Sequence, residues 1–258
     1  MIPTQILRVL STIQTFDVRA LLMGGQACVL YGAAEYSRDL DLAVLATPVA
    51  LPALRSALDS LNASVIAVPS FDVQYLDRGH AVHFSIPDGS VSPLRVDIMS
   101  RLRGVDEFPA LWERRTTIAL PDAVNGRDVL VDVMALEDLV AAKKTQRDKD
   151  WPMLRRLVDA SYAAGRDGAS GDVRVADAQV AFWLAELRSP AFLVELVAQY
   201  PDAAERSSRA VVRAVLRSDD VDAALAIEQA AIMAEDRVYW APLRRELEAL
   251  RHQARSRE

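Results

Sequence analysis

The segment LLMGGQACVLYGAAEYSRDLDLAV, residues 21–44, places a Gly-Gly pair and an Asp-Leu-Asp run within apolar sequence. Residues i and i+2 of a β-strand point to the same face of a sheet, so a strand here would project Asp39 and Asp41 together. Two half-buried carboxylates repel each other and lose hydration unless a cation lies between them. The pattern therefore predicts a site for a hard divalent cation, and Mg²⁺ suits these oxygen ligands.

The glycine pair, Gly24 and Gly25, separates an apolar run from a segment that reads as a short helix. Glycine allows backbone N–H groups to approach an anion closely, and the N-terminus of a helix attracts phosphate. We expect this pair to contact phosphate, the alternative being a tight strand-to-helix turn. Arg38, directly before the first aspartate, is a candidate for positive charge at the same site.

Two further apolar runs, residues 80–86 and 94–100, are typical of strands and predict a hairpin. The second contains Asp97, and an acid in an apolar strand is costly unless it is paired or binds a ligand. We expect Asp97 to be a third carboxylate of the site, provided that its strand lies beside the Asp-Leu-Asp strand. The alternative is an ion pair with Arg95 or Arg38.

Lysine is rare in this chain and is confined to one place. Of thirty basic residues only Lys143, Lys144 and Lys149 are lysine, and all three fall within seven positions. A compact charge on a flexible stem suits a triphosphate, so these lysines are candidates for binding one. A solvated face at a helix end is the alternative.

The composition is that of a folded globular chain: 258 residues, 51% apolar and 26% charged. Strand-like runs alternate with helical patterns up to residue 134, and helical patterns follow. We expect an α/β (α+β) fold, a mixed sheet with flanking helices, followed by an all-helical C-terminal region. The predicted domains are residues 1–134 and 135–258, with a linker-like loop at residues 165–171.

The same composition limits the compartment and the partners. No run approaches the roughly 20 apolar residues of a membrane helix, and the first residues lack the features of a signal peptide. A lone Cys28 excludes an internal disulfide. We therefore expect a cytoplasmic protein that binds no membrane. The net charge of −6 argues against a protein that coats nucleic acid non-specifically.

Together these motifs resemble the signature of the DNA polymerase β-like nucleotidyltransferase superfamily. The resemblance is carried by Gly24-Gly25, by Asp39-Leu40-Asp41-Leu42 and by Val96-Asp97-Ile98. Within that superfamily the chain is most similar to the AbiEii/AbiGii toxin-type nucleotidyltransferases. The segments Glu137-Asp138-Leu139 and residues 143–150 resemble a helical motif of those proteins.

The resemblance spans about residues 18–160 and implies transfer of a nucleoside monophosphate from an NTP, such as ATP, to an acceptor with two Mg²⁺ ions. It implies that Asp39 and Asp41 hold both metals. Asp97 would ligate the catalytic metal and help deprotonate the acceptor hydroxyl. The residues implied to bind the triphosphate are Gly24, Gly25, Arg38, Lys143, Lys144 and Lys149.

Two other functions stay open on these residues. A catalytically inactive relative would keep the fold as a nucleotide- or protein-binding module, and three carboxylates that do not converge would favour it. Alternatively the enzyme is the toxin of a toxin–antitoxin pair, masked by a cognate antitoxin. The acceptor is equally open, since a tRNA end, a protein hydroxyl and a small molecule all suit the same chemistry.

Overall fold

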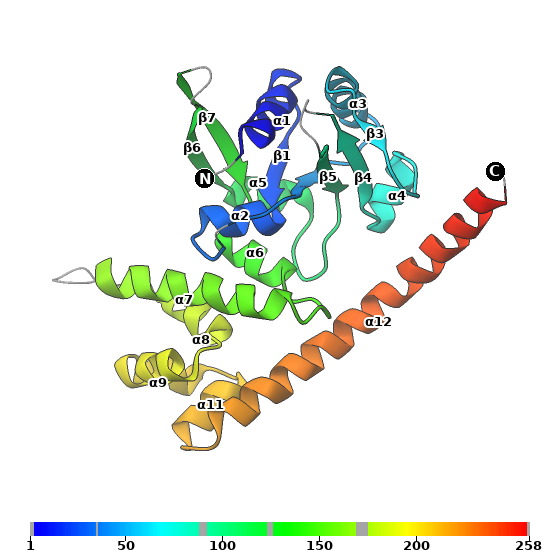
Figure 1. Cartoon of the computed structure of the whole chain (residues 1–258). Helices are drawn as coiled ribbons and strands as arrows, with labels where there is room; N and C mark the ends of the chain where they lie inside the picture. The colour runs from blue at the N-terminus through cyan, green and yellow to red at the C-terminus, as the bar shows by residue number, and fades with distance from the viewer. Residues whose placement is uncertain (1–2, 35, 88–91, 123–125, 169–174, 257–258) are drawn as a thin grey trace. The chain divides into compact units, whose positions relative to one another are not determined.

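The computed structural model describes residues 3–34, 36–87, 92–122, 126–168 and 175–256 (Figure 1). Contacts within the chain divide it into two compact units. The first comprises Met1–Leu30, Ala34–Ala142 and Tyr239–Glu258, and the second comprises Tyr31–Ala33 and Lys143–Val238. The contacts thus change from one unit to the other after residue 142, a few residues beyond the predicted boundary at residue 134.

A seven-stranded mixed sheet forms the centre of the first unit, and its strand order is β3-β4-β5-β2-β1-β7-β6. The pairs β1–β7 and β2–β5 are parallel, and the other pairs are antiparallel. The strands are β1 (Ala20–Met23), β2 (Leu40–Val44), β3 (Ser64–Val65), β4 (Val82–Ile86), β5 (Leu94–Met99), β6 (Thr116–Asp122) and β7 (Arg127–Val133). The predicted hairpin, β4–β5, is confirmed, and β6 and β7 form a second antiparallel pair.

Short helices flank this sheet (Figure 1). They are α1 (Thr4–Thr15), α2 (Gly24–Leu30), α3 (Leu51–Ser60), α4 (Val73–Arg78), α5 (Phe108–Arg114) and α6 (Leu136–Ala142). Helix α1 buries Ile6, Leu10 and Ile13, as their helical spacing predicts, and contacts β7 and α3. Helix α2 contacts β1 and β2, and Cys28 in α2 is fully buried.

The second unit is helical in the part of the chain that the structure describes. Its helices are α7 (Asp150–Gly168), α8 (Asp177–Glu186), α9 (Pro190–Gln199), α10 (Pro201–Arg206), α11 (Ala210–Leu216) and the first part of α12 (Val221–Arg255). Two separate helices are predicted for the α12 segment. The structure corrects this to one helix that contains Pro242.

The predicted linker at residues 165–171 is wrong in its first part, because α7 continues through residues 165–168. Residues 169–171 lie outside the described residues. A Cβ atom on Gly165 would lie 2.4 Å from the Trp183 ring, which is fully buried. This glycine therefore serves close packing of α7 on α8, a role that composition alone does not distinguish from a linker.

The expected fold class, a mixed sheet with flanking helices followed by a helical region, is confirmed. Among the described residues, every helix is too short or too polar to cross a membrane. The central strands β1, β2 and β5 carry the apolar core of the first unit, and Leu22, Leu42 and Ile98 are fully buried. Asp41 and Asp97 of the predicted site therefore lie on strands at the middle of the sheet, whereas Asp39, expected on the same strand as Asp41, directly precedes β2.

Candidate functional site

Strand pairing places Asp41 and Asp97 side by side. Strands β2 and β5 are parallel neighbours, and Asp41 is the register partner of Asp97. Residues at the same register position of adjacent strands point to the same face of a sheet. On the other side of β2, Asp41 pairs with Met23, the last residue of β1 before the glycine pair. Segments that are distant in sequence thus meet at one end of the central strands.

The glycine pair packs directly against this end of the sheet. Gly24 has a φ of +64°, and a Cβ atom there would lie 1.9 Å from Asp41 Oδ2. A Cβ atom on Gly25 would lie 2.3 Å from Ser37 Oγ, and its backbone N–H donates to Asp41 Oδ2 at 3.4 Å. Both positions therefore require glycine for steric reasons. The alternative interpretation, a tight strand-to-helix turn, describes this backbone, and the expected contact with phosphate stays a prediction.

Asp39 and Arg38 lie just before β2 and are exposed to solvent. This short approach to the strand is held by polar contacts, because the Gln26 side-chain amide donates to Ser37 O at 2.8 Å. Gln26 is itself buried, at 1% exposed. The segment that carries Asp39 is thereby attached to α2, the helix that begins at the glycine pair.

Asp97 is buried and is held by two basic side chains. Arg95 donates two hydrogen bonds to it, from Nε to Oδ1 at 2.8 Å and from Nη2 to Oδ2 at 3.0 Å. His83 Nδ1 lies 2.8 Å from Asp97 Oδ1 across the β4–β5 pair. Burial alone would raise the pKa of Asp97, but these hydrogen bonds outweigh it, and the pKa is lowered. The carboxylate is therefore charged, and the predicted ion pair with Arg95 is present.

Arg95 interacts electrostatically with all three of these acids and hydrogen-bonds to Asp97. Its hydrogen bond to Asp97 raises the pKa of the guanidinium despite burial, and the negative charges of Asp39 and Asp41 act in the same direction. The carboxylates are also not gathered tightly. Within residues 3–256, leaving aside the gaps in the description, no group of three or more His, Cys, Asp or Glu side chains could hold a metal ion as it stands.

The three lysines belong to the second unit and lie in the segment between α6 and α7. Lys143 Nζ lies 3.6 Å from the buried Asp150 carboxylate, and Lys144 Nζ donates to Glu186 Oε1 at 2.5 Å. Lys149 is exposed. The first two lysines thus have structural partners within their own unit, and their predicted contact with a triphosphate stays a prediction.

Sequence reasoning missed His83 as a member of this site. It predicts that His80 and His83, three residues apart on a strand, form a poor metal pair, and it gives neither a role at the carboxylates. The signal was present in the predicted hairpin, since a register that pairs residue 83 with residue 97 places the imidazole beside the acid. His80 is buried elsewhere, and its Nε2 lies 3.0 Å from Glu246.

This end of the sheet brings into one region a glycine pair, three carboxylates, an arginine and a histidine. Such a set offers oxygen ligands and basic donors, although the carboxylates do not form a metal-binding group as they stand. Comparison of the chain with protein-family models and with curated proteins gave no match.

Proposed function

We propose that the first unit is a nucleotidyltransferase that moves a nucleoside monophosphate from an NTP to an acceptor hydroxyl or a nucleic-acid end. One observation carries the proposal. Asp41 and Asp97, 56 positions apart, lie at the same register of adjacent strands, and Gly24 packs on the first of them. A third acid, Asp39, precedes Asp41 by two residues and acts electrostatically on the same arginine.

Each residue has a distinct proposed role. Gly24 and Gly25 let the backbone pack closely against Asp41 and Ser37, which places backbone amides beside the proposed phosphate position. Arg38 and Arg95 supply positive charge toward the phosphates, because guanidinium groups match phosphate geometry. Asp97 is the most buried of the three acids, and once released by Arg95 it would orient the acceptor hydroxyl.

Mg²⁺ fits the donor chemistry of this site, since carboxylate oxygens are its preferred protein ligands. Asp39, Asp41 and Asp97 would hold it, and it would supply charge neutralisation at the transferred phosphate. As described, Asp97 is bound by Arg95 and His83. The carboxylate must therefore release the Arg95 guanidinium before all three acids can share a cation.

The second candidate is a protein that keeps this fold and binds a nucleotide or a partner without catalysis. The bidentate ion pair between Arg95 and Asp97 favours it, because that pair satisfies the buried carboxylate without a metal. Action as the toxin of a toxin–antitoxin pair, with a cognate antitoxin as partner, is a further proposal. The proposed acceptor is open among a tRNA end, a protein hydroxyl and a small molecule.

The decisive experiment incubates the purified protein with each α-labelled NTP, Mg²⁺ and a cell lysate, and follows the label into nucleic acid, protein or small molecules. Transfer should be lost in Asp39→Asn and in Asp41→Asn, with unchanged circular dichroism. The matched control is Asp128→Asn, an exposed aspartate on strand β7 of the same sheet, which should keep full transfer. Full transfer by Asp41→Asn would contradict the proposal. A wild-type protein that binds NTP and labels nothing would favour the second candidate.

A further inference from the structure

A cavity of about 590 Å³ lies wholly within the second unit, apart from the carboxylate site. The start of α7, the start of α9 and the first turns of α12 enclose it. Three arginines lie in its wall, together with two aspartates, Asp148 and Asp222. The arginines are Arg155, Arg156 and Arg188.

Arg188 is the buried member of this wall, at 8% exposed. Its Nη1 donates to Glu228 Oε2 at 2.9 Å, and its guanidinium lies 4.8 Å from the centre of the Trp151 ring. Its Nε is buried and has no hydrogen-bond partner. A buried guanidinium donor without an acceptor costs free energy, so this position favours an acceptor supplied from outside the chain.

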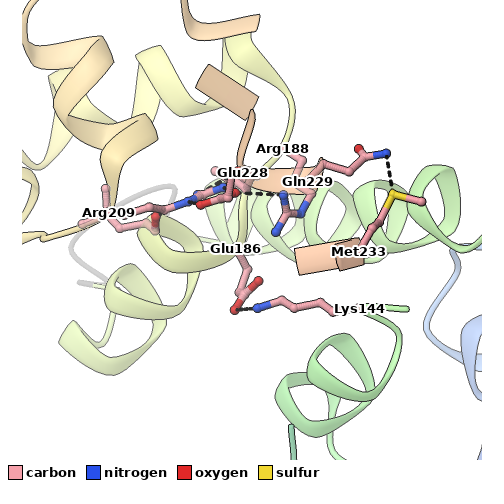
Figure 2. Close-up of polar contacts among 9 residues, drawn as sticks. Lys144, Glu186, Arg188, Arg209, Glu228, Gln229 and Met233 are labelled. Atoms are coloured by element: carbon pink, nitrogen blue, oxygen red, sulfur yellow. Dashed lines mark hydrogen bonds and ion pairs between the residues drawn. The ribbon is translucent and has the colours of Figure 1, made fainter. Parts of the chain in front are cut away.

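Arg188 shares its carboxylate partner, Glu228, with a second arginine. Arg209 binds the same glutamate through Nε and Nη2, both at 2.8 Å, and its Nη1 donates to two backbone carbonyls. Figure 2 shows Arg188 and Arg209 reaching Glu228 from different sides. Two guanidiniums thus share one carboxylate. The donors of Arg209 are satisfied, and Arg188, on which the charge of Glu186 also acts, lines the cavity.

The outer part of the cavity adds donors of the same kind. Arg155 donates from Nε to Ser189 Oγ at 2.7 Å and lies 3.6 Å from Asp159 Oδ2, and both Arg155 and Arg156 are exposed. Gln229 also lines the cavity, and its amide nitrogen donates only weakly, to the Met233 sulfur at 3.8 Å (Figure 2). An oxyanion that entered here would meet guanidinium groups from α7 and from the loop before α9.

We propose that this cavity binds the phosphate group of a small phosphorylated molecule. Phosphate matches the guanidinium donors that Arg155, Arg156 and Arg188 bring to the cavity wall. The volume is within the range of small-molecule sites. The aspartates in the wall and the chain's net charge of −6 disfavour a long polyanion laid across the same surface. This site is separate from the proposed transfer chemistry and does not depend on it.

The test is a calorimetric titration of the full chain with inorganic phosphate at constant ionic strength, set against chloride. It uses the Arg38→Gln background, which removes an exposed arginine proposed to contact phosphate at the carboxylate site, and the comparison of the arginine variants assigns the remaining binding to the cavity. Phosphate should bind, and the double variant Arg155→Gln, Arg156→Gln should weaken binding about tenfold or more. These arginines lie at the exposed side of the cavity, so their loss should not unfold the unit.

The matched control is Arg213→Gln, Arg217→Gln, which removes equal charge from exposed positions on and after α11 outside the cavity wall. It should leave the affinity within about twofold, because exposed charges act weakly at a distance. Equal losses in both double variants, or no phosphate binding, would overturn the proposal. AMP should compete with phosphate. Binding of an RNA 12-mer without terminal phosphate, in the absence of phosphate binding, would also overturn it.

Discussion

Replacing Gly24 by alanine tests whether the glycine pair is required by its contact with the carboxylate. Two costs apply. An alanine at a φ of +64° is strained by about 1–2 kcal/mol, and a Cβ atom 1.9 Å from Asp41 Oδ2 forces that side chain to move. Overpacking of this kind typically costs about 1–3 kcal/mol. We therefore expect Gly24→Ala to lower the free energy of unfolding by about 2–5 kcal/mol.

Gly126 provides the matched control, because its φ is +66° and no atom lies within 4 Å of the added Cβ. Gly126→Ala should cost only the backbone strain, about 1–2 kcal/mol. Both variants equally restrict the unfolded chain, so the difference of about 1–3 kcal/mol isolates the clash with Asp41. Urea unfolding followed by circular dichroism measures both values.

A double-mutant cycle sharpens this comparison. Asp41→Ala removes the carboxylate atoms nearest to the added methyl group, so it should recover part of the loss in Gly24→Ala and none of the loss in Gly126→Ala. Equal destabilisation by the two glycine variants, or a coupling energy of zero with Asp41, would refute the view that this glycine is present for its contact with the carboxylate.

Three further substitutions probe the second unit, each by denaturant unfolding. Burial alone would raise the pKa of Glu228, but hydrogen bonds from Arg188 and Arg209 outweigh burial and lower the pKa below its ordinary value of 4.5. The charged carboxylate therefore stabilises the fold above pH 4.5, and this stabilisation is lost as the pH falls through the lowered pKa. Glu228→Gln should therefore cost about 3 kcal/mol at pH 7 and progressively less below pH 4.5, and a constant cost would contradict this. Gly165→Ala, which would stabilise an open helix, should destabilise by about 1–3 kcal/mol because the methyl group meets Trp183; a gain in stability would show that the helices separate freely. Lys144→Ala should cost about 1–3 kcal/mol by leaving the Glu186 carboxylate unpaired, and no change would mean that water replaces the ion pair.

The elements of the first unit were predictable because their signals are local. The alternation of apolar and polar residues identifies β4 and β5, and the helical spacing of Ile6, Leu10 and Ile13 identifies α1. The sequence predicts that Asp97 lies beside Asp41 only if their two strands are neighbours in the sheet. Parallel pairing of β2 with β5 is set by burial of both strands in one core, and no short motif encodes it.

Other features could not be read from the sequence because their partners are distant. Lys144 and Glu186 are 42 positions apart, so a cluster of lysines gives no sign that one of them is in an ion pair. Gly165 reads as a linker residue until Trp183 is known to pack on it. The Arg95–Asp97 pair, in contrast, joins residues that are close in sequence. Its two residues are i and i+2 on one strand, and the pair was therefore among the alternatives that the sequence predicts.

Asp41 and Asp97 lie on interior strands of the sheet, and this position limits how their backbone can open. Strand β2 is flanked by β5 and β1, and β5 by β4 and β2, so neither lies at an edge. Their amide hydrogens exchange with deuterium only through openings that disrupt the ladders on both sides, whereas β3 and β6 at the edges exchange through smaller fluctuations. We therefore expect the backbone below Asp41 and Asp97 to be among the slowest-exchanging parts of the unit. If a ligand binds at the proposed site, we expect side chains such as Arg95 to move and the sheet to stay in place.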